Sequence, residues 1–306
     1  MRLSSSQVIL QAAFVLSASL AQASACCGGS FSLPAFILTD EAAQLTATYL
    51  VSRPISDVLA SGKWVRRTDD ELQQTLRLDS AISVSDRWQV NFSAQTSRRS
   101  RIVSGDSQSH VNLGDISLSA AYEPWFEDGE SLLRPKTLFF AQLLLPTGRS
   151  IYEAEDPLAL DVAGQGHFNL GFGAIFMKVF APRWDVFVSP EVHRGLPRTF
   201  STPEGDLQTQ PKFGGSLSLG GGWNYSAYRL GVTLTSLYED GIETDGRVTT
   251  QPTPQRYSSL ALSLGWLITP DWTTSINYAD QSLLGAPLTT VLSRSVSLTL
   301  QYRALR

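Results

Sequence analysis

Alternation of apolar and small polar residues runs through most of this chain, and the segment from Tyr257 to Ala279 shows it most clearly. Leu and Trp fill every second position from Leu260 to Trp266, with Ser, Ala and Gly between them. After Thr269-Pro270-Asp271 the same two faces continue to Ala279. Side chains alternate across a strand, so this segment is predicted to be a β-hairpin with one apolar and one small polar face.

Segments of the same kind recur along the chain, each about nine to thirteen residues long. Strands of that length, when tilted, are long enough to cross a bilayer. We predict twelve strands, at residues 44–52, 74–85, 88–97, 113–122, 137–145, 168–180, 184–193, 213–223, 227–238, 258–267, 272–279 and 294–303.

The connections between these strands strictly alternate between short and long. Four of the five connections at one end are tight turns, and the fifth, residues 123–136, is longer and acidic. The six at the other end are long and polar, at residues 53–73, 98–112, 146–167, 194–212, 239–257 and 280–293. This alternation is typical of outer-membrane barrels, whose short turns are periplasmic and whose long loops are extracellular. The sequence therefore predicts an all-β, antiparallel up-and-down transmembrane β-barrel of twelve strands, within a range of ten to fourteen.

Aromatic placement gives a second line of evidence for a membrane. Six of the seven Trp lie beside the predicted short turns. An indole has an apolar body and a polar N–H, so it prefers the bilayer interface. The last strand ends in an apolar face that includes Tyr302, as in bacterial outer-membrane barrels, although four more residues follow it. A soluble β-protein with an ordinary aromatic core is the alternative.

The N-terminus divides into two predicted regions before the barrel at residues 43–306. Residues 1–25 have an Arg, an apolar core and the small-residue motif Ala23-Ser24-Ala25, which predicts a signal peptide; a membrane anchor is the alternative. Residues 26–42 form a periplasmic lead or a plug in the lumen, and the apolar SFSLPAFILTD could also simply extend the first strand. Cys26 and Cys27 cannot staple the fold, and lipidation of Cys26 stays open.

Composition excludes some classes of function. Charged residues are 17% of the chain and the formal net charge is −4, and we find no basic patch, so no nucleic-acid partner is expected. After the N-terminus no run of about 18 apolar residues predicts a membrane-spanning helix. No metal-ligand cluster and no cofactor motif is present in the sequence, so neither a metal nor a cofactor is predicted.

Three stretches carry a resemblance to a known family: LGDISLSAAY at residues 113–122, LLLPTG at residues 143–148 and GHFNLGFGAIFMKVF at residues 166–180. Over about residues 112–267 the chain resembles the outer-membrane proteins named for the MetA pathway of phenol degradation. The resemblance implies a barrel of a kind often described as a transporter of small compounds, with aromatic or hydrophobic ones as candidates, but it does not supply a ligand. It supplies no catalytic residues, and Gly114-Asp115 and Pro146-Thr147-Gly148 are interpreted as a strand start and a strand exit.

Alternation places a set of polar side chains on the lumen face. Both charge signs occur among them, which favours a hydrated interior without strong ion selectivity. For any one of them, an ion pair that only stabilises the wall is the interpretation that we favour over a role in the solute path. The predicted solute path includes Arg77, Asp79, Asp115, Gln142, Asp185, Glu191, His193 and Arg229.

Catalysis is not predicted. His193 shares a lumen face with Glu191 and Ser189, but alternate residues on a strand are about 7 Å apart, which we expect to be too far for a direct relay. No nucleophile elbow or zinc-protease motif occurs in the sequence.

The function predicted from the sequence is an outer-membrane channel or transporter for passive or facilitated passage of small solutes, hydrophobic or aromatic ones among them. The alternative is a barrel without transport that has a structural or surface-binding role. The expected partners are outer-membrane lipid, the barrel-insertion machinery and the solute. The sequence leaves open the identity of the solute, the oligomeric state and whether the lumen is plugged.

Overall fold

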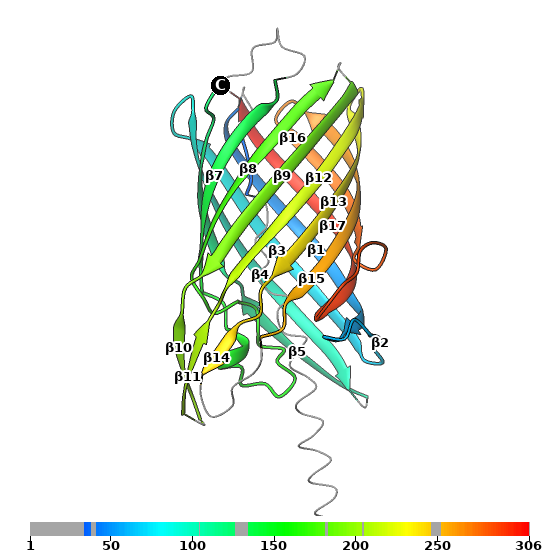
Figure 1. Ribbon diagram of the computed structural model, residues 1–306. Coiled ribbons are helices and arrows are strands. Elements are labelled where there is room, and N and C mark those ends of the chain that lie inside the picture. Colours follow the sequence, from blue (N-terminus) through cyan, green and yellow to red (C-terminus); the bar gives the residue numbers. More distant parts are fainter. Residues whose placement is uncertain are drawn as a thin grey trace, which may run out of the picture.

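Strand pairing closes the sheet on itself, because β17 (Thr290–Leu305) pairs with β1 (Glu41–Val58) from Glu41↔Leu305 to Val58↔Thr290. The computed structural model describes residues 34–37, 41–103, 105–125, 134–180, 183–203, 205–245 and 252–305. The predicted signal peptide and Cys26 lie outside the described residues. The result is a tilted antiparallel barrel (Figure 1).

The predicted number of twelve strands is confirmed. The sheet contains fourteen strands, but β2 (Trp64–Arg66) is a short addition to β1, and β5 and β6 both pair with β4 as two pieces of one strand. The remaining wall strands are β3 (Asp70–Ser83), β4 (Trp88–Val103), β5 (Asp106–Leu113), β6 (Ile116–Tyr122), β7 (Lys136–Leu145), β8 (Asn169–Phe180), β9 (Trp184–Gly195), β12 (Phe213–Tyr225), β13 (Tyr228–Glu239), β15 (Gln255–Thr269) and β16 (Trp272–Asp280).

The two ends of the barrel differ as predicted. Tight turns such as the two residues between β12 and β13 lie at the upper end in Figure 1, where the C-terminus also lies. The long connections lie at the lower end, which we call the long-loop end. There β10 (Arg198–Thr202), β11 (Gly205–Gln210) and β14 (Glu243–Asp245) form a separate three-stranded sheet.

Several predicted loops are in fact strands. Residues 98–112 were expected to be a long loop, but β4 continues to Val103 and β5 starts at Asp106, with pairs such as Arg99↔His110. Polar residues alternate here without an apolar face, because this hairpin extends beyond the apolar band of the wall. The pattern used to find strands therefore ended before the backbone pairing did.

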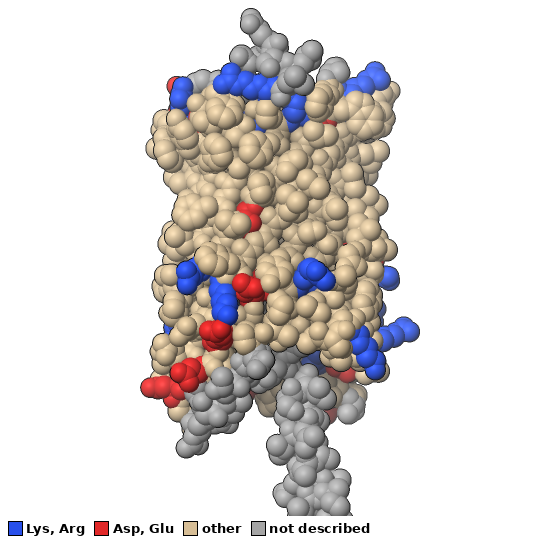
Figure 2. Space-filling model, viewed as in Figure 1, with Lys and Arg blue, Asp and Glu red and all other residues tan. Residues whose placement is uncertain are grey.

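Apolar side chains face outward along the wall. Leu262, Ile276 and Leu298 lie on neighbouring strands, and each is more than half exposed. In Figure 2 charged residues gather towards the two ends, and a broad band between them carries few charges. A barrel satisfies its backbone hydrogen bonds within the wall, so this band is suited to lipid.

The aromatic residues at the short-turn end pair with one another across neighbouring strands. Trp88 lies 4.8 Å from Tyr122, and Trp272 lies 5.1 Å from Tyr302, between ring centroids. Trp184 and Trp223 are 6.4 Å apart. These pairs form part of an interfacial girdle, in agreement with the sequence. Within the part of the chain that the structure describes, we find no helix long and apolar enough to cross a membrane.

Candidate functional site: the barrel lumen

The lumen contains a cavity of about 530 Å³ on the side formed by β17, β1 and β3. Its wall is made mainly of Gln, Ser and Thr side chains at alternate strand positions. Arg77 and Asp79, two of the predicted path residues, line it and pair with each other at 2.6 Å. We call this cavity the chamber.

Residues 34–37, which we call the inner segment, lie inside the barrel. The Ile37 N–H donates to Gln89 Oε1 at 2.7 Å, and the Phe36 ring lies 5.6 Å from that of Phe140. The Asn91 amide, turned so that its hydrogen bonds are best satisfied, donates to the Ala35 carbonyl at 2.9 Å. Pro34 and Ala35 form part of the chamber wall. The segment that the sequence left open as lead or plug therefore contacts the lumen face.

At the long-loop end, residues 146–168 turn into the mouth of the barrel, and we call them the inward loop. Leu160 is fully buried and Val162 nearly so. Arg99, on the lumen face of β4, donates to the carbonyls of Ala159 at 3.1 Å and Val162 at 3.4 Å. Asn112 Nδ2 donates to the Leu160 carbonyl at 2.7 Å. The wall thus binds the loop through the carbonyl groups of its backbone.

The base of the inward loop is held by Asp115, which lies between β5 and β6. Its carboxylate accepts hydrogen bonds from the Gly148 N–H at 2.9 Å and the Gln165 N–H at 2.7 Å. Gly164 packs directly on Gly148, and a Cβ at Gly164 would lie 2.5 Å from the Gly148 carbonyl oxygen. The motifs interpreted as a strand start and exit therefore also fix a loop.

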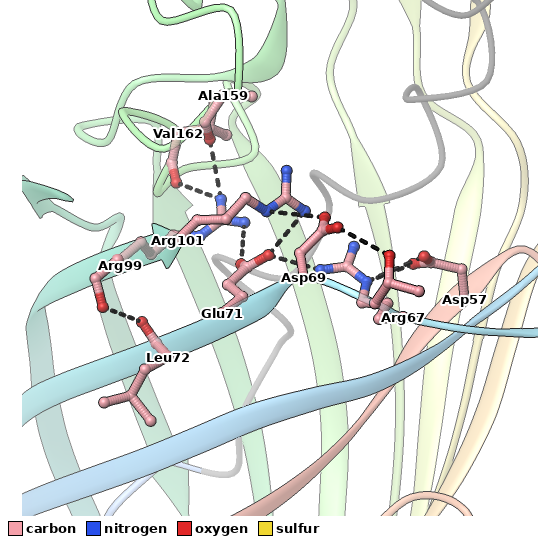
Figure 3. A network of polar contacts seen from close by, with 11 residues as sticks. Asp57, Arg67, Asp69, Glu71, Leu72, Arg99, Arg101, Ala159 and Val162 are labelled. Carbon is pink, nitrogen blue, oxygen red and sulfur yellow. Dashed lines mark hydrogen bonds and ion pairs between the residues drawn. The ribbon is translucent and has the colours of Figure 1, made fainter. Parts of the chain in front are cut away.

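A network of six charged residues lies beside the inward loop (Figure 3). Glu71 is buried and contacts Arg67 at 2.6 Å, Arg99 at 2.8 Å and Arg101 at 3.0 Å. The other two carboxylates are Asp57, 2.9 Å from Arg67, and Asp69, 3.6 Å from Arg101. We call this the mouth network; its three Arg and three carboxylates balance in charge.

Aromatic packing joins the inward loop to β10. The Tyr152, His167 and Phe200 rings lie within 4.9–6.1 Å of one another, and Arg198 lies 4.6 Å over Phe200. Burial lowers the pKa of His167 from 6.5 to about 4, so this imidazole is neutral at neutral pH. Burial alone would raise the pKa of Asp161, but hydrogen bonds from the Glu155 N–H and Arg149 outweigh it and lower that pKa.

The other predicted path residues lie outside the chamber wall. Gln142 donates to Ser117 at 3.1 Å, Asp115 holds the loop, and Asp185 binds Arg229 at 2.5 Å. His193 lies with both ring nitrogens against carboxylates, Glu191 at 2.7 Å and Glu239 at 2.9 Å. The residues are therefore spread around the lumen and are not gathered at one point.

The expectation that Glu191 is too far from His193 for direct contact was wrong. Both side chains project into the lumen and lean together, so the distance between Cα atoms overstates the gap. Ser189 does not join them, because its hydroxyl donates to the Ala174 carbonyl at 2.9 Å. An imidazole bonded on both nitrogens to carboxylates is suited to an ion pair rather than to activating this serine.

Sequence reasoning missed Glu71, Arg99 and Gln73. Gln73 and Glu71 share the lumen face of β3 with Arg77, so extending that strand by alternation would have found them. The inner segment and the inward loop lack any such periodic signal.

A closed barrel with an apolar outer band, an aromatic girdle and a polar lumen defines a transmembrane β-barrel of the outer-membrane type. The family model described as "Putative MetA-pathway of phenol degradation" matches residues 97–281. The chain belongs to this family, as the resemblance had indicated.

Solved structures agree with the fold. The COG4313 outer membrane channel from Pseudomonas putida F1 has a TM-score of 0.70 at 14% identity, covering 90% of this chain and 99% of that one. The transport unit of the autotransporter AIDA-I from Escherichia coli has a TM-score of 0.50 at 11% identity, covering 94% of this chain and 97% of that one. No curated protein matches the sequence.

Proposed function

We propose that the barrel is a channel for passive or facilitated passage of small solutes across the outer membrane. The chamber is the main observation behind this proposal, because a barrel that served only as a scaffold would need no cavity of about 530 Å³ in its lumen. The long-loop end would face outward and the short-turn end the periplasm. The family description and the COG4313 channel support transport, and small aromatic or hydrophobic compounds are the first solutes to test.

Two elements would narrow the route. The inward loop covers part of the mouth, and the inner segment lies on the lumen face near β4 and β7. Together they favour a narrow path for small solutes over a wide water-filled pore. We propose that the inner segment acts as a plug, which is the role the sequence left open for residues 26–42.

Ion flux from liposomes containing the purified barrel tests this proposal. Liposomes that contain the wild-type barrel should release potassium slowly. Gln89→Ala removes the acceptor for the Ile37 N–H, so it should loosen the inner segment and raise the flux several-fold.

The control is Gln142→Ala, which removes a lumen amide that makes no hydrogen bond to the inner segment among the described residues. The control should leave the flux near that of wild type. If the folded wild-type barrel releases no ions and Gln89→Ala changes nothing, the non-transporting alternative is supported instead.

His193 gives no comparable support to catalysis, since Ser189 is turned away from it. A lipid hydrolase would need a nucleophile beside that imidazole.

A further inference from the structure

The chamber is lined by side chains that form hydrogen bonds without carrying charge. Five glutamines reach it from different parts of the wall: Gln44, Gln73, Gln95, Gln255 and Gln281. Each amide offers two donor hydrogens and one acceptor oxygen, so such a wall can bind hydroxyl, amide and carbonyl groups alike. Its volume of about 530 Å³ also falls within the range of about 300–1,000 Å³ that is usual for small-molecule sites.

Charge in the chamber is internally compensated. Among the residues that the structure describes, its charged lining residues are Arg77 and Asp79, whose side chains lie 2.6 Å apart on the same strand. The mouth network likewise has three Arg and three carboxylates, so its formal charges cancel. An ion entering from water would lose hydration there without meeting an unpaired opposite charge, which is unfavourable.

One buried amide oxygen of the wall has no hydrogen-bond partner among the described residues. Gln44 is 9% exposed; its Nε2 donates to Thr46 Oγ1 at 3.0 Å, whereas its Oε1 has no partner in the described part of the chain. A buried acceptor of this kind is costly to leave unpaired. Its Oε1 is itself shielded from solvent, so a donor on a bound solute reaches it only if the Gln44 side chain turns into the chamber that it lines.

From these observations we propose that the chamber is a binding site for uncharged solutes that carry hydroxyl or amide groups, and that it disfavours ionised solutes of similar size. This inference rests on the proposed channel function and adds its solute class. The apolar Leu50 and Val291 in the same wall allow contact with a hydrocarbon portion of the solute. The glutamine amides select solutes whose polar groups can form hydrogen bonds with them.

Liposome swelling measures the preference directly. The probes are arabinose, which is uncharged, gluconate, which is an anion, and protonated glucosamine, which is a cation. Wild type should admit arabinose at least about threefold faster than either ion, since charge compensation leaves ions with no favourable partner. Equal or faster entry of either ion would overturn the inference.

A charge placed in the chamber should change this order. Thr75 lines the chamber and faces uncharged Leu50 and Ser97 on its two neighbouring strands. Thr75→Asp should slow gluconate relative to glucosamine by about three- to fivefold, and Thr75→Lys should do the opposite. Thr233→Asp is the control, because Thr233 shares the lumen face of β13 with Arg229 but does not line the chamber.

Binding is tested by the block of single-channel current on adding arabinose. Gln44→Leu removes one of the five glutamine amides of the chamber wall and should weaken the block by about tenfold. A heat-shift gel confirms that every variant is folded. If the wild-type barrel passes neither ions nor solutes, the channel function itself fails. If it conducts but Thr75→Asp, Thr75→Lys and Gln44→Leu all behave as wild type, only the solute class is wrong.

Discussion

The substitution Glu71→Gln removes the carboxylate at the centre of the mouth network while keeping the shape of the side chain. Glu71 is only 2% exposed and contacts three guanidinium groups, of which Arg67 and Arg99 are themselves at least nine-tenths buried. The variant leaves three Arg facing the two carboxylates of Asp57 and Asp69. It also disturbs Arg99, which binds the inward loop.

Removing one partner of a buried ion pair typically costs about 3–5 kcal/mol, because the other charge stays buried without compensation. The expected loss is about 3 kcal/mol in the free energy of unfolding, at the lower end, since Asp57 and Asp69 remain and are partly open to water. The unbalanced positive charge should also make the channel more selective for anions.

Urea unfolding in detergent, followed by Trp fluorescence, measures the first effect. The matched control is Asp70→Asn, the neighbouring residue, whose ion pair with Arg53 at 2.7 Å is more than half exposed on both sides. An exposed pair of this kind contributes at most about 1 kcal/mol. If Glu71→Gln loses no more stability than Asp70→Asn, the mouth network is only a solvated surface cluster and the reasoning is refuted.

Three further predictions concern the inward loop. Asp115→Ala removes two hydrogen bonds to the loop, so it should weaken loop packing by about 3 kcal/mol and raise conductance, as measured by single-channel recording. Gly164→Ala should raise conductance too, because its Cβ would overlap Gly148, whereas Gly265→Ala, with its nearest neighbour at 3.7 Å, should not. The pKa of His167 is about 4 in the folded protein and 6.5 in the unfolded chain. The stability that the neutral imidazole contributes is therefore fully present above pH 6.5 and is lost as the pH falls towards 4. The thermal midpoint of wild type should decrease from pH 7 to pH 5, and that of His167→Phe should decrease less. Equal pH dependence of wild type and His167→Phe would contradict the last of these.

The wall of the barrel could be predicted from the sequence because lipid and lumen impose opposite demands on successive residues. Leu262 and Ile276 face outward, towards lipid, whereas the residues that follow them, Ser263 and Asn277, face the lumen. Tryptophans beside the turns then identified the short-turn end. The strand count followed from these local signals.

The interior elements could not be predicted in the same way. The inward loop packs Leu160 against groups supplied by β4 and β5, and contacts so distant in sequence leave no periodic trace. The inner segment is apolar, but an apolar segment before a strand is equally suited to extending that strand. The partners of His193 come from two strands, and Glu239 lies 46 residues away from it.

Single-channel recording of the wild-type barrel in a planar bilayer at neutral pH tests the proposed channel most directly. The barrel should first show the gel shift on heating that marks a folded outer-membrane barrel. We expect small, discrete conductance steps, because a route through the chamber stays narrow between the inner segment and the inward loop. A protein that shows the gel shift but gives no steps at any voltage would contradict the proposed channel.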